Sequence, residues 1–181
     1  METAKSHARR FVEGWYDRYA PADKPGIDIG CGADPLHSTF GKWDYQLGNG
    51  DATLMTGVKN ETYTTVYASH VLEHLTQPRI ALQNWWRILA KGGHLIVVVP
   101  HRDLYECRKK LPSQWNPDHK WFYLPHRAEN PHTLGLFQTV YQTLANGEIV
   151  SFRVLDEGYR RIGNEHPQGE YSIECIVRKP A

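Results

Sequence analysis

The stretch at residues 26–32, Gly-Ile-Asp-Ile-Gly-Cys-Gly, constrains the fold of this chain more than any other. Its two isoleucines alternate with Asp28 as in a short buried strand, and Gly30 and Gly32 then allow the backbone to turn sharply and to lie against a ligand. Open α/β sheets bind ligands at the carboxyl ends of their strands. We therefore expect a binding site here, in which the carboxylate of Asp28 suits a positively charged ligand.

The loop after this strand departs from the dinucleotide fingerprint G-x-G-x-x-G, because its third glycine is absent. Asp34 and Pro35 stand where a diphosphate would meet the free amides of a helix N-terminus. A carboxylate repels phosphate, and proline has no N–H to donate. The loop thus disfavours an NAD-dependent enzyme and is compatible with a nucleoside that carries no phosphates.

Length and charge set broad limits on the class of protein. The 181 residues predict a single domain (1–181) with its own core, and the net charge of +1 implies neither a nucleic-acid nor an anionic membrane partner. The three cysteines, Cys31, Cys107 and Cys175, are odd in number and widely spaced, as free thiols in a reducing compartment are. The N-terminus has no apolar core of a signal peptide and no run is long enough to span a bilayer, so we expect a cytoplasmic protein.

The hydrophobic pattern predicts an alternation of strands and helices. The first crossover, between residues 32 and 44, is too short for a full helix, so that helix is expected to be short or missing. Residues 101–130 show little periodicity and many aromatic side chains, which favours a lid or insert that excludes water from a bound substrate. Helices are expected at 7–20, within an N-terminal segment 1–24, then after Thr76 up to Gly92, and at 133–145. Strands are expected at 26–30, 39–44, 63–69, 94–100, 148–156 and 171–178. The strands at 148–156 and 171–178 are expected to pair antiparallel.

Two acidic residues that follow the first strand have both a functional and a local interpretation. Asp44, at the end of the second strand, can accept hydrogen bonds from ribose hydroxyls, or it can be a turn residue before a Gly-Asn-Gly loop. Asp51 can accept from an adenine amino group while the amide of Ala52 donates to a ring nitrogen; the alternative is again a turn. The spacing alone leaves these alternatives open.

Taken together, these motifs resemble the class I S-adenosylmethionine-dependent methyltransferases of the small type 11 kind. The resemblance covers roughly residues 26–100 and rests on four stretches in the expected order: 27–32, 50–53, 68–75 and 85–93. It implies a Rossmann-like three-layer sandwich whose seven-stranded, mostly parallel sheet has the order 3-2-1-4-5-7-6, with strand 7 antiparallel. This chain departs from the family at Asp34-Pro35, at the truncated crossover, and at Thr64-Thr65, where the family has an aspartate.

The resemblance also implies S-adenosyl-L-methionine as the cofactor, with S-adenosyl-L-homocysteine as the product. It implies that Asp28, Gly30, Cys31 and Gly32 contact the methionine part of the cofactor, with Asp28 near its amino group. Asp44 would bind the ribose, and Asp51 and Ala52 the adenine. Ser69 and His70 would lie at the sulfonium end.

The cofactor implies in-line displacement of a methyl group by an O or N of a small-molecule or glycan-type acceptor. Where the acceptor must lose a proton, histidine is suited to accept it at neutral pH. His101, just beyond a strand, and His119 are the candidates, although His119 and Asp118 can also form a pair that stabilises the fold.

The sequence also bears on other functions. The spacing of Cys107, Asp118, His119, His126 and His132 matches no zinc pattern, so we expect no metal. A nucleic-acid methyltransferase is disfavoured because the chain has no basic stretch beyond residues 108–110. A protein that binds the cofactor, or only keeps the fold, and acts through a partner is the alternative from another class. The sequence indicates no oligomeric state.

Overall fold

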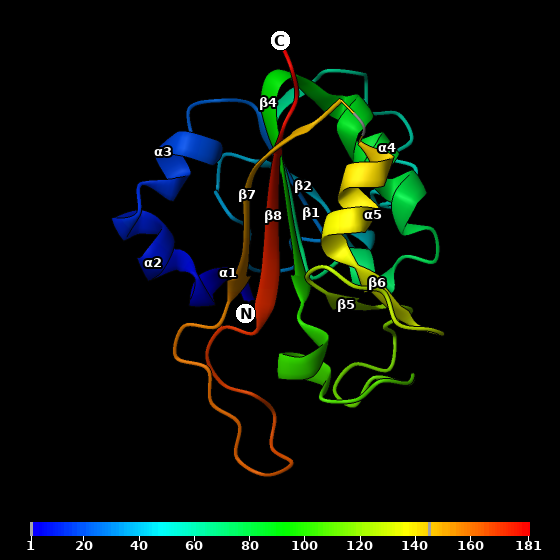
Figure 1. Ribbon diagram of the computed structural model, residues 1–181. Helices are drawn as coiled ribbons and strands as arrows, with labels where there is room; N and C mark the ends of the chain where they lie inside the picture. Colours follow the sequence, from blue (N-terminus) through cyan, green and yellow to red (C-terminus); the bar gives the residue numbers. More distant parts are fainter. Residues whose placement is uncertain (1, 145) are drawn as a thin grey trace.

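A computed structural model describes residues 2–144 and 146–181. Its centre is a sheet with the order β2-β1-β3-β4-β8-β7 (Figure 1). Two further short strands, β5 and β6, pair in parallel apart from this sheet. The strands are β1 (Gly26–Ile29), β2 (Gly41–Trp43), β3 (Tyr63–Ser69), β4 (Leu89–Pro100), β5 (Phe122–Leu124), β6 (Thr133–Gly135), β7 (Glu148–Leu155) and β8 (Ser172–Arg178).

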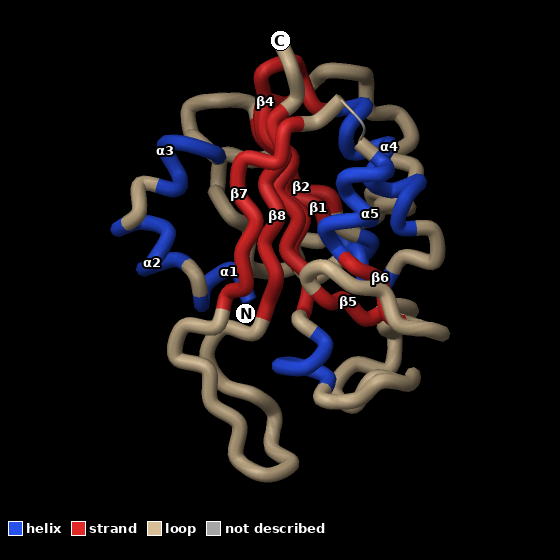
Figure 2. The backbone as a smooth tube through the Cα atoms, viewed as in Figure 1, coloured by secondary structure: helices blue, strands red, loops and turns tan. Residues whose placement is uncertain are grey.

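Helices cover both faces of the sheet, which gives the three layers that the family resemblance implies (Figure 2). On one face lie α1 (Glu2–Lys5), α2 (His7–Val12) and α3 (Trp15–Tyr19), and on the other α4 (Pro78–Ile88) and α5 (Leu136–Thr143). No helix within the described ranges is long and apolar enough to cross a bilayer.

The core is divided between the two faces because side chains alternate along a strand. In β4, Leu95, Val97 and Val99 belong to the larger cluster, which also contains residues of α4 and α5. Ile96 and Val98 belong to the smaller cluster, which contains residues of the N-terminal helices. A strand buried on both faces needs the continuous apolar run that this part of the sequence has.

The strand pairing confirms the fold class and corrects one detail of it. β1 pairs in parallel with β2 and β3, β3 pairs in parallel with β4, and β8 is antiparallel to both β4 and β7. The sheet has six strands in the described part of the chain, whereas the resemblance implies seven. The strand expected after β2 is replaced by turns, in which Gly50, Met55 and Gly57 have positive φ. Such residues interrupt the extended conformation that a strand requires.

Several predicted boundaries also differ from the structure. The helix expected at 7–20 is broken at Gly14, which has a φ of 63°. The helix expected to end at Gly92 ends at Ile88, and the chain enters β4 directly. Its N-cap is Gln77 rather than Thr76. The helix expected at 133–145 begins only at Leu136, after β6; its predicted end at residue 145, like residue 1 of the N-terminal segment, lies outside the described residues.

The short crossover after β1 is confirmed. Residues 30–40, all of which the structure describes, contain turns and bends and no helix. Its apolar residues Leu36 and Phe40 are buried in the smaller core cluster. The adjacent N-terminal helices cover this face of the sheet, as Figure 1 shows.

A buried ion pair connects the N-terminal helices to the sheet. The Arg10 guanidinium of α2 donates to Glu174 Oε2 of β8 at 2.9 Å and to the Tyr67 hydroxyl at 3.1 Å, and it lies 4.3 Å from the ring centre of Trp15. Arg10 and Glu174 are 1 % and 0 % exposed, so neither charge is compensated by water. Removal of one partner leaves the other buried and unpaired.

We predict that Glu174→Ala lowers the free energy of unfolding by about 3–5 kcal/mol, because the buried Arg10 charge loses its partner. Glu148→Ala is the matched control: Glu148 forms an exposed ion pair with Arg178, 2.7 Å apart, and its removal should cost about 0–1 kcal/mol. Urea denaturation of the three proteins measures both values. Equal effects of the two substitutions would contradict this account.

Candidate active site

Two adjoining clefts lie where β1 and β3 end. Their volumes are about 560 Å³ and 360 Å³, and they share Gly30 and His70. Ligand pockets of roughly 300–1,000 Å³ are usual for small molecules and cofactors. The larger cleft is lined by Gly30, Trp43, Asp44, Tyr45, Gln46, Gly50, Asp51, Ala52, His70, Val71, His74, Leu75 and Asp118, and the smaller by Thr3, Asp28, Gly30, Cys31, Gly32, Asp34, Ser69 and His70.

The structure brings together all nine residues that the sequence predicts for the cofactor. Five line the larger cleft and six the smaller, with two in common. They come from separate stretches of the chain, at the end of β1 and after it, after β2, and at the end of β3 and after it, which the parallel pairing places at one edge of the sheet. These residues are Asp28, Gly30, Cys31, Gly32, Asp44, Asp51, Ala52, Ser69 and His70.

Gly30 lies at the junction of the two clefts, and its position allows no side chain. Its φ is +70°, a left-handed conformation that L residues rarely adopt. A Cβ atom there would lie 2.2 Å from Cγ2 of Val71, which follows β3. Gly32 also has a positive φ, +51°, but a Cβ there would meet no atom within 4 Å. Gly30 therefore serves both the turn and the close approach of two strand ends.

Asp44 connects two loops that lie at the clefts. Its Oδ2 accepts the Gly32 N–H at 2.9 Å, and its Oδ1 accepts the Gln46 N–H at 2.9 Å. The carboxylate is the N-cap of the short helix η1 (Tyr45–Leu47) and also ties this helix to the loop after β1. An ionised carboxylate has about four acceptor positions, so two remain for other donors such as vicinal hydroxyls.

Asp28 contributes a buried carboxyl group to the smaller cleft. It is 2 % exposed, and its Oδ2 accepts the Leu36 N–H at 2.7 Å. Burial raises the pKa of Asp28 to about 7, against the lowering effect of that hydrogen bond. The charged groups around it are Asp34 and Asp44, which raise its pKa further, and Arg10, which lowers it.

The N-terminal segment closes one side of the smaller cleft. Thr3 of α1 lines it, and the Ala4 N–H donates to Asp34 Oδ2 at 3.1 Å. The Thr3 and Tyr67 hydroxyls are 3.4 Å apart. The N-terminal helices thus contribute residues 3 and 4 to the side of this cleft.

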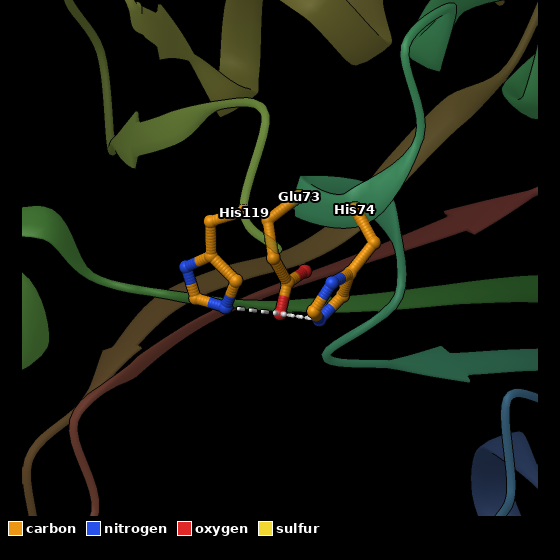
Figure 3. Close-up of side chains that lie close together, drawn as sticks. All are labelled: Glu73, His74 and His119. Carbon is orange, nitrogen blue, oxygen red and sulfur yellow. Dashed lines mark ion pairs between the residues drawn. The ribbon is translucent and has the colours of Figure 1, made fainter. Parts of the chain in front are cut away.

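A group of histidines and carboxylates lies beside the larger cleft. Glu73 and His74 belong to the short helix η2 (Leu72–His74), and His119 comes from the loop before β5. Figure 3 shows the Glu73 carboxylate between the two imidazoles, with Oε1 3.9 Å from Nε2 of each. Burial and the neighbouring His119 lower the pKa of His74, against the effect of its hydrogen bond to Asp118. Asp118 and His74 line the cleft.

The two predicted catalytic histidines occupy different positions. His101 lies outside the lining that the described residues give either cleft; its Nδ1 accepts the Asp103 N–H at 3.1 Å, and burial lowers its pKa. His119 is buried next to His74, with ring centres 4.8 Å apart, and its Nδ1 bonds Glu106 Oε1 at 2.6 Å. The structure thus brings His119 near the cleft and leaves His101 apart.

The segment 101–130 is tied to η2, and its aromatic side chains pack within the protein. The Lys120 and Trp121 N–H groups both donate to the Glu73 carbonyl oxygen, at 2.8 and 3.1 Å. Phe122 and Tyr123 are buried in β5. Of this segment, Asp118 is the residue found in the cleft lining, and the lid stays a prediction.

Sequence reasoning missed some residues of the site. Tyr45 and Gln46 line the larger cleft beside Asp44. Asp44 is the N-cap of the short helix that contains them, and a capping aspartate at this position could have indicated that helix. Thr3 gave no signal, because its position depends on how the N-terminal helices pack. The cluster of Glu73, His74 and His119 was also missed: the close pair at 73–74 was visible, but its distance from residue 119 along the chain hid the third member.

Comparison with known proteins identifies the family. Residues 4–130 match the model of a family described as a methyltransferase domain. Because this is more than half of the chain, the protein belongs to this methyltransferase family, and membership implies S-adenosyl-L-methionine as its cofactor. None of the curated proteins matches the chain.

Solved structures share the fold at low sequence identity. A S-adenosylmethionine-dependent methyltransferase of Archaeoglobus fulgidus is 14% identical with a TM-score of 0.57, covering 98% of this chain and 94% of its own. A Thermotoga maritima protein described as a possible histamine N-methyltransferase is 16% identical with a TM-score of 0.52, covering 97% and 96%. A Haloferax volcanii protein in complex with the methyltransferase activator Trm112 is 9% identical with a TM-score of 0.54, covering 100% and 98%. At these identities the likeness shows the fold alone.

We predict that Gly30→Ala is more harmful than Gly32→Ala. Both substitutions cost about 1–3 kcal/mol for a left-handed alanine, but only the first also meets Val71 and adds roughly 1–3 kcal/mol of overpacking. Chemical denaturation measures the difference, and Val71→Ala in the Gly30→Ala background should recover part of it. Equal losses for both glycines would contradict the packing argument.

The buried carboxyl of Asp28 predicts a pH dependence of stability. Because the folded protein holds this proton more tightly than the unfolded chain does, its contribution favours folding at low pH and is lost as pH rises from about 4 to about 7. In Asp28→Asn, this part of the decline, a few kcal/mol, should disappear. Free energies of unfolding measured across this range test the prediction, which fails if the two profiles run parallel.

Proposed function

We propose that this protein transfers the methyl group of S-adenosyl-L-methionine to an oxygen or nitrogen of a small-molecule or glycan-type acceptor. The observation that carries the proposal is the convergence of the nine predicted cofactor residues on two adjoining clefts at the carboxyl edge of the sheet. Methyltransferase family membership supports it independently.

The residues present fit the cofactor at each of its parts. Asp44 has acceptor positions left for two ribose hydroxyls. Asp51 and Ala52 line the same cleft, as an adenine-binding pair must. Gly30 and Gly32 present bare backbone at the smaller cleft, and the carboxyl group of Asp28 lies close by for the amino group. An ammonium group there would favour the ionised form of Asp28.

The mechanism requires positioning rather than a protein nucleophile. S-adenosyl-L-methionine supplies a methyl group already activated on a sulfonium. His70, the residue with Gly30 at the junction of the clefts, would lie at the reacting end, and its imidazole is fixed by a 2.9 Å contact between Nε2 and Ser172 Oγ. Holding the two reactants in the right orientation can lower the activation free energy by several kcal/mol. The predicted base His119 is held in place by Glu106, whose Oε1 lies 2.6 Å from His119 Nδ1.

The low net charge supports the proposed acceptor class. A net charge of +1 gives no field that would attract nucleic acid. The neighbour described as a possible histamine N-methyltransferase is compatible with a small acceptor. We also propose a cytoplasmic location, in keeping with three cysteines that are free thiols.

The second candidate is a protein that binds the cofactor and acts through a partner. The short crossover after β1, where residues 30–40 contain no helix, is the observation that favours it. Such a protein would bind S-adenosyl-L-homocysteine but would itself transfer no methyl group to any acceptor. Incubation with radiolabelled cofactor and a panel of small hydroxyl and amine acceptors, with structured RNA beside them, separates these functions.

We predict that Asp44→Ala weakens binding of S-adenosyl-L-homocysteine by about 2–4 kcal/mol, or roughly thirtyfold to a thousandfold, because two hydrogen bonds to a charged acceptor are lost. Calorimetric titration measures the affinity. Asp23→Ala, at an exposed position in the loop before β1, is the control and should leave it unchanged.

Because Asp44 also supports the loop, the free energy of unfolding of each variant is measured without ligand. Unchanged affinity in a folded Asp44→Ala protein would remove Asp44 from the cofactor site. Absence of binding by the unmodified protein would overturn the proposed function.

A further inference from the structure

The arrangement of Glu73, His74 and His119 has the features of a ligand set for a metal ion. One donor atom from each residue lies within 4.8 Å of the other two. Glu73 Oε1 is 3.9 Å from Nε2 of His74 and 3.9 Å from Nε2 of His119. These separations are too long for hydrogen bonds, whereas donor atoms around a tetrahedral ion with about 2.0–2.1 Å bonds are roughly 3.4 Å apart. Small side-chain movements would therefore complete the site.

The other nitrogen of each imidazole faces a carboxylate. His119 Nδ1 is 2.6 Å from Glu106 Oε1, and His74 Nδ1 is 3.0 Å from Asp118 Oδ2. With the proton on Nδ1 in each ring, both Nε2 lone pairs are directed toward Glu73, as Figure 3 shows for the two imidazoles. Histidine ligands of metals are usually oriented by such a second carboxylate. Two histidine–carboxylate pairs that converge on one further carboxylate therefore indicate a metal-binding arrangement.

We propose that Glu73, His74 and His119 bind one divalent transition-metal ion at the side of the larger cleft. Two imidazole nitrogens and one carboxylate form a set typical of catalytic zinc and non-haem iron sites, which leave coordination positions for water or substrate. Magnesium and calcium prefer oxygen ligands throughout. The structure thus assigns a site that the spacing of histidines and cysteines along the chain does not predict.

The position of the site indicates its use. His74 and Asp118 line the larger cleft, and His70, at the junction of the two clefts, has its Nδ1 3.7 Å from Glu73 Oε1. An ion held here would expose its remaining positions to that cleft and could bind and polarise an oxygen of the acceptor. This use rests on the proposed methyl transfer, whereas ion binding itself does not.

The test is titration of the chelator-treated protein with Zn²⁺ by calorimetry, and with Co²⁺ by visible absorption. We expect one ion per chain, at least tenfold weaker binding in His74→Ala, and no comparable binding of Mg²⁺. Asp118→Asn removes the carboxylate that orients His74. Because the Asp118 side chain is largely exposed, this variant should still fold. Its affinity for the ion should fall about 10–100-fold.

His126→Asn is the matched control, because His126 is exposed and packs against Phe137 and Phe152 instead. It should bind as the unmodified protein does. Absence of one-to-one binding, or binding unaltered in His74→Ala, would overturn the metal site. Titration of S-adenosyl-L-homocysteine into the chelated protein reports on the cofactor site separately, so failure of one proposal is distinguishable from failure of the other.

Discussion

The parallel pairing of β1 with β2 on one side and with β3 on the other is the constraint on which the site depends. It brings three strand ends, and the loops after them, to one edge of the sheet. The approach is close: Gly30 follows β1 directly against Val71, which follows β3, and a methyl group in between would collide. Asp44, after β2, then fixes the first loop by accepting the Gly32 N–H. The clefts are thus a consequence of strand order and of one position without a side chain.

The two faces of the sheet contribute differently to this edge. On one face the buried Arg10–Glu174 pair holds the N-terminal helices, and through them Thr3, against the smaller cleft. On the other, η2 and the segment before β5 are joined by two hydrogen bonds to the carbonyl oxygen of Glu73. That junction concentrates histidines and carboxylates beside the larger cleft. The predicted cofactor contacts and the proposed ion site therefore adjoin one another at His70 and His74.

The sequence was sufficient for the parts of the structure that depend on local pattern. The alternation around Asp28 and the apolar run in β4 predicted buried strands, and the nine cofactor residues that the family resemblance implies lie together. It was insufficient where tertiary packing decides. The hydrophobic spacing predicts one helix through Gly14, but the structure breaks the helix there. Turns replace the strand that the family resemblance implies after β2. Glu73 and His119 meet only because the chain returns to η2 after β4, which no spacing rule anticipates.

The most direct measurement is a crystal structure of the protein with S-adenosyl-L-homocysteine. The account predicts the ribose hydroxyls at Asp44, the adenine beside Asp51 and Ala52, and the amino group at Asp28. A ligand bound elsewhere, or bound in these clefts in the reverse orientation, would contradict it.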